Sequence, residues 1–268
     1  MLDKIQDSAI LKIANSLKID DVFFLFATEI EFFVLDDEIL TLKNDKMQKF
    51  YQDLQNFAQK NNIIIENIEK EDGINQFEIQ LQPNDLATEL SDQIVLIKNE
   101  IARLLTVDFR AKPFIDRPGN SMHFHISLYD ENEQNLFMKL DQDYQNNLYY
   151  AVGGLLKNMP SSMPIFAPTQ NCYERYKIDK TKHIQYPTNY SWGINNRTCA
   201  IRIPQSITVN PQNTRIEHRV CSGIADPHSS LSAIIDGICE GIINKIIPPD
   251  PIFGNSFDAQ YNIKNILL

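Results

Sequence analysis

Four segments of the chain place charged or imidazole side chains at every second position among apolar residues. The clearest is segment 122–128, which reads Met-His-Phe-His-Ile-Ser-Leu. Residues i and i+2 of a β-strand point to the same side of a sheet, so this alternation predicts a strand with one apolar and one polar face. Several strands of this kind predict a sheet that is buried on one side and carries functional groups on the other.

Two of these segments are acidic. In segment 27–33, Glu29 and Glu31 share a face while Ile30 and Phe32 point into the core. Adjacent carboxylates repel each other unless a cation or an arginine lies between them, although both could simply face water on an edge strand. In segment 71–78, Gly73 allows a tight turn that brings Glu71 and Glu78 together. Mg²⁺ prefers such carboxylate ligands, and an ordinary acidic turn is the alternative.

The other two segments carry imidazole and guanidinium groups. His123 and His125, two of five histidines, share a face with Ser127. Imidazole is a frequent metal ligand, but a structural histidine explains either position equally well. Arginines suit bidentate binding of carboxylate or phosphate, and a structural ladder of ion pairs is the alternative. They stand at Arg175, Arg197, Arg202, Arg215 and Arg219.

Taken together, carboxylates, histidines and arginines on strand faces predict a Mg²⁺–nucleotide site for phosphoryl transfer. The chain has no glycine-rich phosphate loop, which argues against a P-loop or Rossmann domain.

Composition excludes several other classes of partner. Asp and Glu number 35 against 25 Lys and Arg, so the formal net charge is −10. Such a surface repels phosphate backbones and anionic lipid, and no apolar run is long enough to span a bilayer. We therefore expect neither a nucleic acid nor a membrane partner. Four cysteines without CxxC spacing predict reduced thiols in a cytoplasmic protein.

The periodicity predicts the order of the elements. Helices are expected at 1–20, 45–61, 88–105, 145–157 and 229–244, and strands at 21–36, 63–68, 76–81, 122–129, 189–192, 198–203 and 214–220. Residues 160–185, which are polar and rich in lysine, are expected to be irregular. Strand follows strand more often than strand alternates with helix, which favours an antiparallel α+β domain over a doubly wound sheet.

Five strings in this order resemble the glutamine synthetase family: EIEFF from Glu29, NQFEI from Asn75, MHFHISL from Met122, SWGINNRT from Ser191 and RIEHR from Arg215. The resemblance runs from about residue 22 to residue 254. The second and fourth strings are most similar to a bacterial branch that includes gamma-glutamylpolyamine and gamma-glutamylmethylamide synthetases.

The resemblance implies a curved antiparallel sheet backed by helices, with ATP and an amino acid entering a common site from opposite ends. It implies one Mg²⁺ or Mn²⁺ bound by Glu31, Glu71 and Glu78, and another bound by Glu29, His123 and Glu217. It also implies nucleotide contacts from His125 and Ser127, and a contact from the Gly119 backbone to the amino acid. Substrate carboxylate would be bound by Arg175 and Arg219, and phosphate by Arg197, Arg202 and Arg215.

The implied reaction is that of an ATP-dependent ligase. ATP converts the side-chain carboxylate of glutamate, or of a close analogue, to an acyl phosphate, and ammonia or a small amine then attacks it. The expected partners are therefore small-molecule substrates, together with a homo-oligomeric copy or a separate chain.

Three departures from the family pattern qualify this expectation. Residues 1–268 read as a catalytic domain without the family's N-terminal β-grasp domain and C-terminal helices. The flap after Arg175 is long, and an alignment on Pro187 puts Gln185 where the family has a proton-accepting glutamate, with Asp179 as the substitute. A degenerate paralogue that binds nucleotide without turnover is therefore the alternative. The motifs fit a guanidino kinase poorly.

Overall fold

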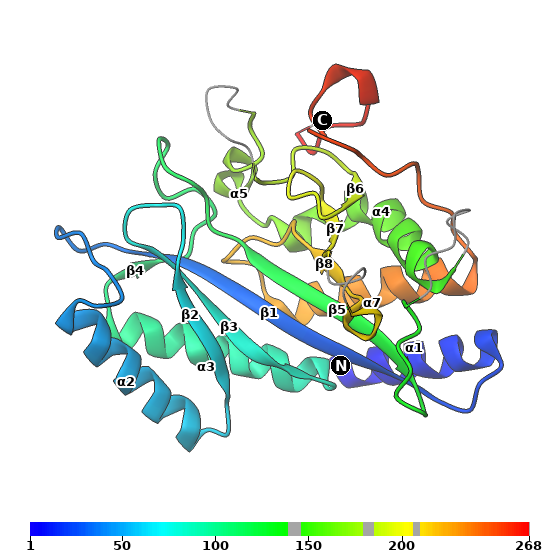
Figure 1. Ribbon diagram of the computed structural model, residues 1–268, viewed down its shortest axis with the longest axis horizontal. Helices are drawn as coiled ribbons and strands as arrows, with labels where there is room; N and C mark the ends of the chain where they lie inside the picture. The colour runs from blue at the N-terminus through cyan, green and yellow to red at the C-terminus, as the bar shows by residue number, and fades with distance from the viewer. Residues whose placement is uncertain (139–145, 179–184, 206–209, 268) are drawn as a thin grey trace.

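The computed structural model describes residues 1–138, 146–178, 185–205 and 210–267. Over these ranges one sheet has the strand order β2-β3-β1-β5-β8-β7-β6, with β4 beside β1. Its strands are β1 (Val22–Val34), β2 (Ile65–Lys70), β3 (Gln76–Asn84), β4 (Val107–Asp108), β5 (Met122–Asp130), β6 (Trp192–Ile194), β7 (Ile201–Ile203) and β8 (Ile216–His218). The long strands β1 and β5 cross the middle of the molecule (Figure 1).

Most of the helices form a layer against one face of this sheet, whereas α5 lies apart from them, near the cavity described below (Figure 1). They are α1 (Leu2–Leu17), α2 (Asp45–Lys60), α3 (Ala87–Leu104), α4 (Asn147–Phe166), α5 (Gln170–Glu174) and α7 (Pro227–Ile243), with short 3₁₀ turns at Pro211–Asn213 and Ala259–Tyr261. Helices α1 and α3 contact β1, α2 packs on α3, and α7 packs on α1, α3 and α4. The predicted α+β class is confirmed, although the β6–β7 pair is parallel within an otherwise antiparallel sheet.

The alternation in the sequence explains why the helices cover only one face. Alternate residues of β1 face the core, and except for the buried Thr28 they are apolar, including Phe24, Phe26, Ile30 and Phe32. Helix α3 meets this face with the helically spaced stripe Leu90, Ile94, Ile97 and Ile101, all fully buried. Burying each such side chain contributes about 1.5–3 kcal/mol, which favours packing of α3 on this apolar face of β1 over packing on its polar face.

The expected irregular segment 160–185 is wrong at its start, because α4 continues through Pro160 and Pro164 to Phe166 and α5 follows it. A proline inside a helix removes one backbone hydrogen bond. Here Met159, Met163 and Phe166 are buried and continue the stripe of α4 that faces the core. Tertiary packing therefore outweighs the local signal of the prolines.

The strand expected at 189–192 is also misplaced, since β6 begins at Trp192 and ends at Ile194. Its position follows from its neighbours: β6 pairs with β7, and the Trp192 carbonyl accepts a hydrogen bond from the Ile252 amide. Among the described residues, no helix is long and apolar enough to cross a lipid bilayer.

Candidate active site

Most of the predicted site residues meet on the sheet face that the helices leave open. The strand register places Glu31 opposite Glu78, and Glu29 opposite His123. It also places Glu217 opposite both His125 and Arg202. Because directly paired residues share a face, a row of ionisable side chains runs across the sheet from β3 to β7.

A cavity of about 340 Å³ opens above this row. The predicted residues that line it are Glu29, Glu31, Glu71, Glu78, Gly119, His123, Arg175, Gln185, Arg197 and Arg219. The predicted residues outside its lining are His125 and Ser127 on β5, Arg202 on β7, Glu217 on β8 and Arg215, which directly precedes β8. Asp179 is outside the described residues.

Glu31 and Glu78 are both buried in this row. Ser121 donates its amide to Glu31 Oε2 at 3.0 Å and its hydroxyl to Glu31 Oε1. The side-chain Nε2 of Gln80 donates to Glu78 Oε1 at 2.8 Å. Burial, reinforced by the charges of Glu29 and Glu31, raises the pKa of Glu78 to about 9. The crowding of carboxylates therefore disfavours ionisation of Glu78 in the absence of a cation.

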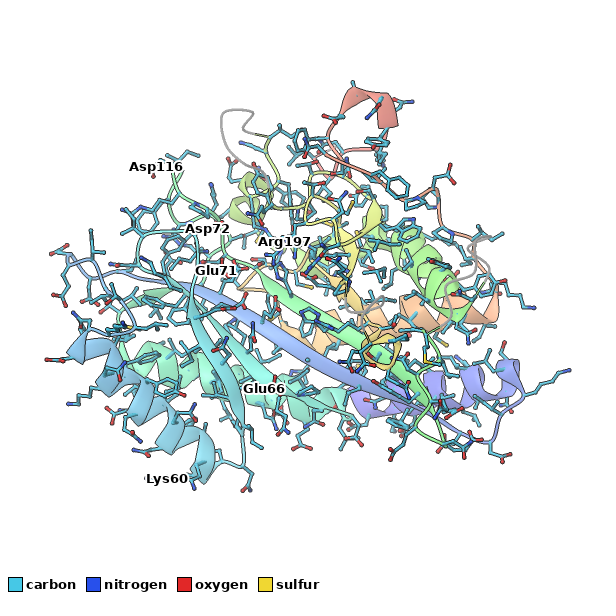
Figure 2. All side chains as sticks on the ribbon, viewed as in Figure 1. Lys60, Glu66, Glu71, Asp72, Asp116 and Arg197 are labelled. Carbon is cyan, nitrogen blue, oxygen red and sulfur yellow. The ribbon has the colours of Figure 1, made fainter. Side chains whose placement is uncertain are left out.

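Glu71 enters the site from the turn between β2 and β3. Burial and the charge of Glu31 raise its pKa to about 7. Glu71 and Asp72 line the same cavity as Arg197, which comes from the loop after β6 (Figure 2). Acidic and basic side chains from distant parts of the chain therefore line the same cavity.

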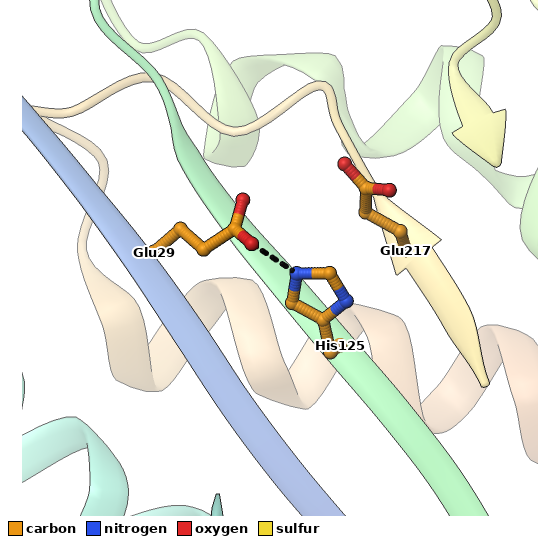
Figure 3. Close-up of side chains that lie close together, drawn as sticks. All are labelled: Glu29, His125 and Glu217. Atoms are coloured by element: carbon orange, nitrogen blue, oxygen red, sulfur yellow. Dashed lines mark ion pairs between the residues drawn. The ribbon is translucent and has the colours of Figure 1, made fainter. Parts of the chain in front are cut away.

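Glu29 is held by both histidines of β5. His123 Nδ1 lies 3.1 Å from Glu29 Oε2, and His125 Nε2 lies 3.0 Å from Glu29 Oε1. Burial by itself would raise the pKa of Glu29, but hydrogen bonds from His123 and His125 outweigh it and hold the pKa well below its usual range. Figure 3 shows Glu29 and Glu217 on either side of His125.

Glu217 is clamped between two arginines. Arg202 Nη1 lies 2.6 Å from Glu217 Oε2, and Arg219 Nη1 pairs with Glu217 Oε1. Burial opposes ionisation, but the charges of Arg219, the two histidines and Arg202 lower the pKa of Glu217 to about 2. Glu217 is therefore an anion at any physiological pH.

In the part of the chain that the structure describes, three sets of side chains bring ligand atoms within 4.8 Å of one another: Glu29–His125–Glu217, Glu29–Glu78–His123 and Glu69–Glu71–Glu78. Oxygen ligands with one imidazole suit Mg²⁺ or Mn²⁺, so the donor chemistry fits the predicted cations. The grouping differs from the predicted trios, because Glu29 belongs to two sets and Glu31, whose oxygens accept hydrogen bonds from Ser121, belongs to none.

Arg175 and Gly119 form one wall of the cavity. Arg175 Nη2 donates to the carbonyls of Arg219 at 3.1 Å and Val220 at 2.9 Å. A Cβ at position 119 would lie 2.4 Å from the Ala111 carbonyl oxygen and 2.7 Å from Arg175 Cγ. Only glycine fits here, because any side chain would collide with the Ala111 backbone and with Arg175.

The residues predicted to contact nucleotide lie further along β5. Arg215 Nε donates to His125 Nδ1 at 3.1 Å. The hydroxyl of Ser127 donates to the Thr214 carbonyl at 3.1 Å. Both side chains are therefore held toward β8 and the segment that precedes it.

Sequence reasoning missed several residues of the site. Gln76 and Gln80 flank Glu78 at period 2, a signal that could have placed them on the same face. Ser121 directly precedes β5 and is buried beside Glu31. Lys112, Arg117 and Tyr186 also line the cavity, but they come from loops in which no periodic pattern identified them.

This fold and this site define a family. The profile of the glutamine synthetase catalytic domain matches residues 39–266, so the chain belongs to that family. Its relatives include gamma-glutamylputrescine synthetase PuuA of Escherichia coli K12, 32% identical over 191 residues, and type-1 glutamine synthetase 2 of Dictyostelium discoideum, 33% identical over 227 residues. These matches cover 69% and 81% of this chain but 39% and 41% of the relatives, so the chain spans about two fifths of their length.

Solved structures confirm the predicted fold. Glutamine synthetase of Plasmodium falciparum superposes with a TM-score of 0.78 at 20% identity, covering 96% of this chain and 58% of the other. A complex of GmaS with ADP superposes with a TM-score of 0.76 at 21% identity, covering 97% and 63%.

Proposed function

We propose that the chain is a carboxylate–amine ligase that uses ATP and Mg²⁺ or Mn²⁺. It joins the side-chain carboxylate of glutamate, or of a close analogue, to ammonia or a small amine through an acyl phosphate. The observation that carries this proposal is the row of Glu31, Glu78, Glu29 and His123 beneath a cavity whose walls include Arg175, Arg197 and Arg219. Carboxylates for cations beside arginines for anions suit phosphoryl transfer.

The proposed roles follow from this arrangement. A cation bound by the carboxylates and His123 would neutralise charge on the phosphoryl group during transfer. Arg197 reaches the cavity from its rim, and Arg202 and Arg215 lie beyond its edge on β7 and next to β8. We assign these three arginines to phosphate and Arg175 and Arg219 to substrate carboxylate. We assign His125 and Ser127 to the nucleotide and the Gly119 backbone to the amino acid.

The reaction needs activation because a carboxylate does not react with amines. Transfer of the γ-phosphoryl group of ATP to the carboxylate oxygen makes phosphate the leaving group. The amine nitrogen then attacks the carbonyl carbon, phosphate departs and the nitrogen loses a proton. Arginines held in place before substrate arrives stabilise this charge without further reorganisation.

The direct test is incubation of the chain with ATP, Mg²⁺ and glutamate, with ammonia, methylamine or putrescine, while phosphate release is measured. Hydroxylamine in a parallel reaction traps an activated acyl group as a hydroxamate. Amine-dependent phosphate release and hydroxamate formation are the expected results. The proposal is contradicted if neither product forms at any cation concentration.

A second function, nucleotide binding without turnover, is favoured by one observation. Gln185 lines the cavity with a neutral side chain, and its backbone carbonyl accepts a hydrogen bond of 2.8 Å from Arg219 Nη2. A glutamine at that point accepts no proton from an ammonium ion. ADP binding by calorimetry, together with no phosphate release, would select this second function.

We also propose that the chain acts as a homo-oligomer or beside a separate chain. This part of the proposal is supported by the family resemblance. Size-exclusion chromatography with light scattering measures the molar mass in solution and tests it against the 30.9 kDa of one chain.

A further inference from the structure

Gln76 lies at the centre of a hydrogen-bond network beneath the cavity. Its Nε2 lies 2.9 Å from the Gly119 carbonyl oxygen, 3.0 Å from Asn120 Oδ1 and 3.5 Å from Glu31 Oε2. Its Oε1 accepts a hydrogen bond of 3.0 Å from the Gly73 amide. The side chain of Gln76 is buried, and through these bonds it connects the turn that carries Glu71 with the carboxylate of Glu31.

The orientation of this network is determined by Asn120, which is fully buried. Its Nδ2 donates to the carbonyls of Asp108 at 2.9 Å and Arg110 at 3.1 Å. Its Oδ1 therefore faces Gln76, and only the NH₂ group of Gln76 can satisfy it. The same NH₂ group points to Glu31, so Gln76 presents a donor and not an acceptor to that carboxylate.

Ser121 holds Glu31 from the other side. Its amide donates to Oε2 at 3.0 Å and its hydroxyl donates to Oε1, so one residue contacts both carboxylate oxygens. The Glu31 amide in turn donates to the Ser121 carbonyl at 3.1 Å, which extends the β1–β5 ladder. The side chain of Glu31 is thereby fixed to the same backbone pair that carries it.

We propose that Ser121 and Gln76 are positioning residues that orient the Glu31 carboxylate for a divalent cation. The inference rests on the proposed function, because the cation site is part of that proposal. A carboxylate oxygen has two lone pairs. Oε1 of Glu31 accepts one hydrogen bond, from the Ser121 hydroxyl, and keeps a lone pair for a cation, whereas Oε2 accepts from both the Ser121 amide and Gln76. Loss of a residue that orients a metal ligand typically weakens metal affinity by about 10–100-fold.

Positioning and simple charge attraction predict opposite results for Gln76→Glu. The new carboxylate adds negative charge to the site, which by attraction alone would tighten cation binding. It also places an acceptor against Gly119 O, Asn120 Oδ1 and Glu31 Oε2, which breaks the network that orients Glu31. Positioning therefore predicts weaker binding despite the added charge.

The test is titration with Mn²⁺, with the free ion followed by electron paramagnetic resonance. The variants are Ser121→Ala, Ser121→Cys and Gln76→Glu. Matched controls on α3 are Ser91→Ala, which removes a buried hydroxyl bonded to the Ala87 carbonyl, and Gln93→Glu, which adds one carboxylate away from the cavity. Thermal unfolding without Mn²⁺ shows that each variant is folded.

We expect the Kd for Mn²⁺ to rise about 10–100-fold in Ser121→Ala, less in Ser121→Cys, which keeps a weak donor, and at least tenfold in Gln76→Glu. The controls should stay within about twofold of the unmodified chain. If folded Ser121→Ala and Gln76→Glu bind Mn²⁺ as tightly as the controls, or Gln76→Glu binds more tightly, the inference is overturned and the proposed function stands. If the unmodified chain binds no Mn²⁺, the proposed function itself is overturned.

Discussion

Glu31 of β1 and Glu78 of β3 lie directly opposite each other in the antiparallel sheet, and the two residues are only 8% and 4% exposed. Like charges in such a pair are destabilising, and low exposure removes the water that would screen them. Hydrogen bonds from Ser121 and Gln80 moderate this repulsion without neutralising it. The fold therefore carries a local cost that a divalent cation between the strands would offset.

The first prediction concerns this pair. The pKa of Glu78 rises from 4.5 to about 9 in the folded chain, so folding at pH 7 requires this carboxyl to take up a proton. Glu78→Gln has nearly the same shape and needs no proton, so in EDTA at pH 7 the variant should melt about 1–4 °C above the unmodified chain. The same variant should lose most of the rise in melting temperature that Mg²⁺-ATP gives the unmodified chain by mass action. Differential scanning fluorimetry with and without Mg²⁺-ATP measures both effects.

Glu66→Gln on β2 is the matched control, because Glu66 is exposed and lies outside the cavity (Figure 2). It should retain the full shift with Mg²⁺-ATP. A full shift in Glu78→Gln as well would remove Glu78 from the proposed ligands.

The second prediction concerns Gly119. A methyl group added by Gly119→Ala meets the Ala111 carbonyl and displaces Arg175. Overpacking of this kind costs about 1–3 kcal/mol, and it moves a guanidinium assigned to substrate carboxylate. We expect urea unfolding at lower concentration and a higher KM for glutamate. Gly254→Ala, a glycine at φ 92° outside this cavity, should lower stability without raising that KM.

The third prediction concerns pH and Lys98 of α3, whose amino group lies 5.0 Å from the Phe109 ring centre. Burial lowers the pKa of Lys98 to about 8, although the charge of Asp226 opposes this. Between pH 8 and about 10.4, the pKa of an unperturbed lysine, the unfolded chain binds more protons than the folded chain. The contribution of Lys98 to stability therefore increases as pH rises through this window.

Urea unfolding at pH 7.5 and pH 10 checks this sign. The unmodified chain should gain on the order of 1–3 kcal/mol relative to Lys98→Met between these two pH values. Lys60→Met changes an exposed lysine at the end of α2 and should show no such gain (Figure 2). If the gain in unfolding free energy relative to Lys98→Met equals the gain relative to Lys60→Met, then Lys98 is solvated and its pKa is not lowered.

The fourth prediction concerns the choice of amine. Glutamine formation with ammonia should be slow, whereas formation of the acyl phosphate persists, because Gln185 cannot accept the proton of ammonium. Gln185→Glu should raise ammonia-dependent phosphate release, since one positioned general base contributes about two to four orders of magnitude in rate. Gln59→Glu, an exposed position on α2, should change nothing. Brisk ammonia-dependent turnover by the unmodified chain would contradict this assignment of Gln185.

The faces of the strands were predictable from the sequence, because side-chain alternation is a local property of extended backbone. Segments 27–33 and 122–128 placed Glu29, Glu31, His123 and His125 on the polar face before any pairing was known. The stripe of α3 was equally readable from its helical spacing. The strings of residues on these faces indicated the glutamine synthetase family, and the family profile confirms it.

Only the tertiary structure decided which of these residues meet. The register that sets Glu31 against Glu78, and Glu217 against both His125 and Arg202, depends on pairing between strands that are distant in the chain, and no local pattern determines it. The same holds for α4, where packing of Met159 and Met163 overrides Pro160. Ser121 and Gln76 gain their contacts with Glu31 only when three segments come together. Long-range pairing and packing selected the contacts, whereas local periodicity set only the face on which each side chain lies.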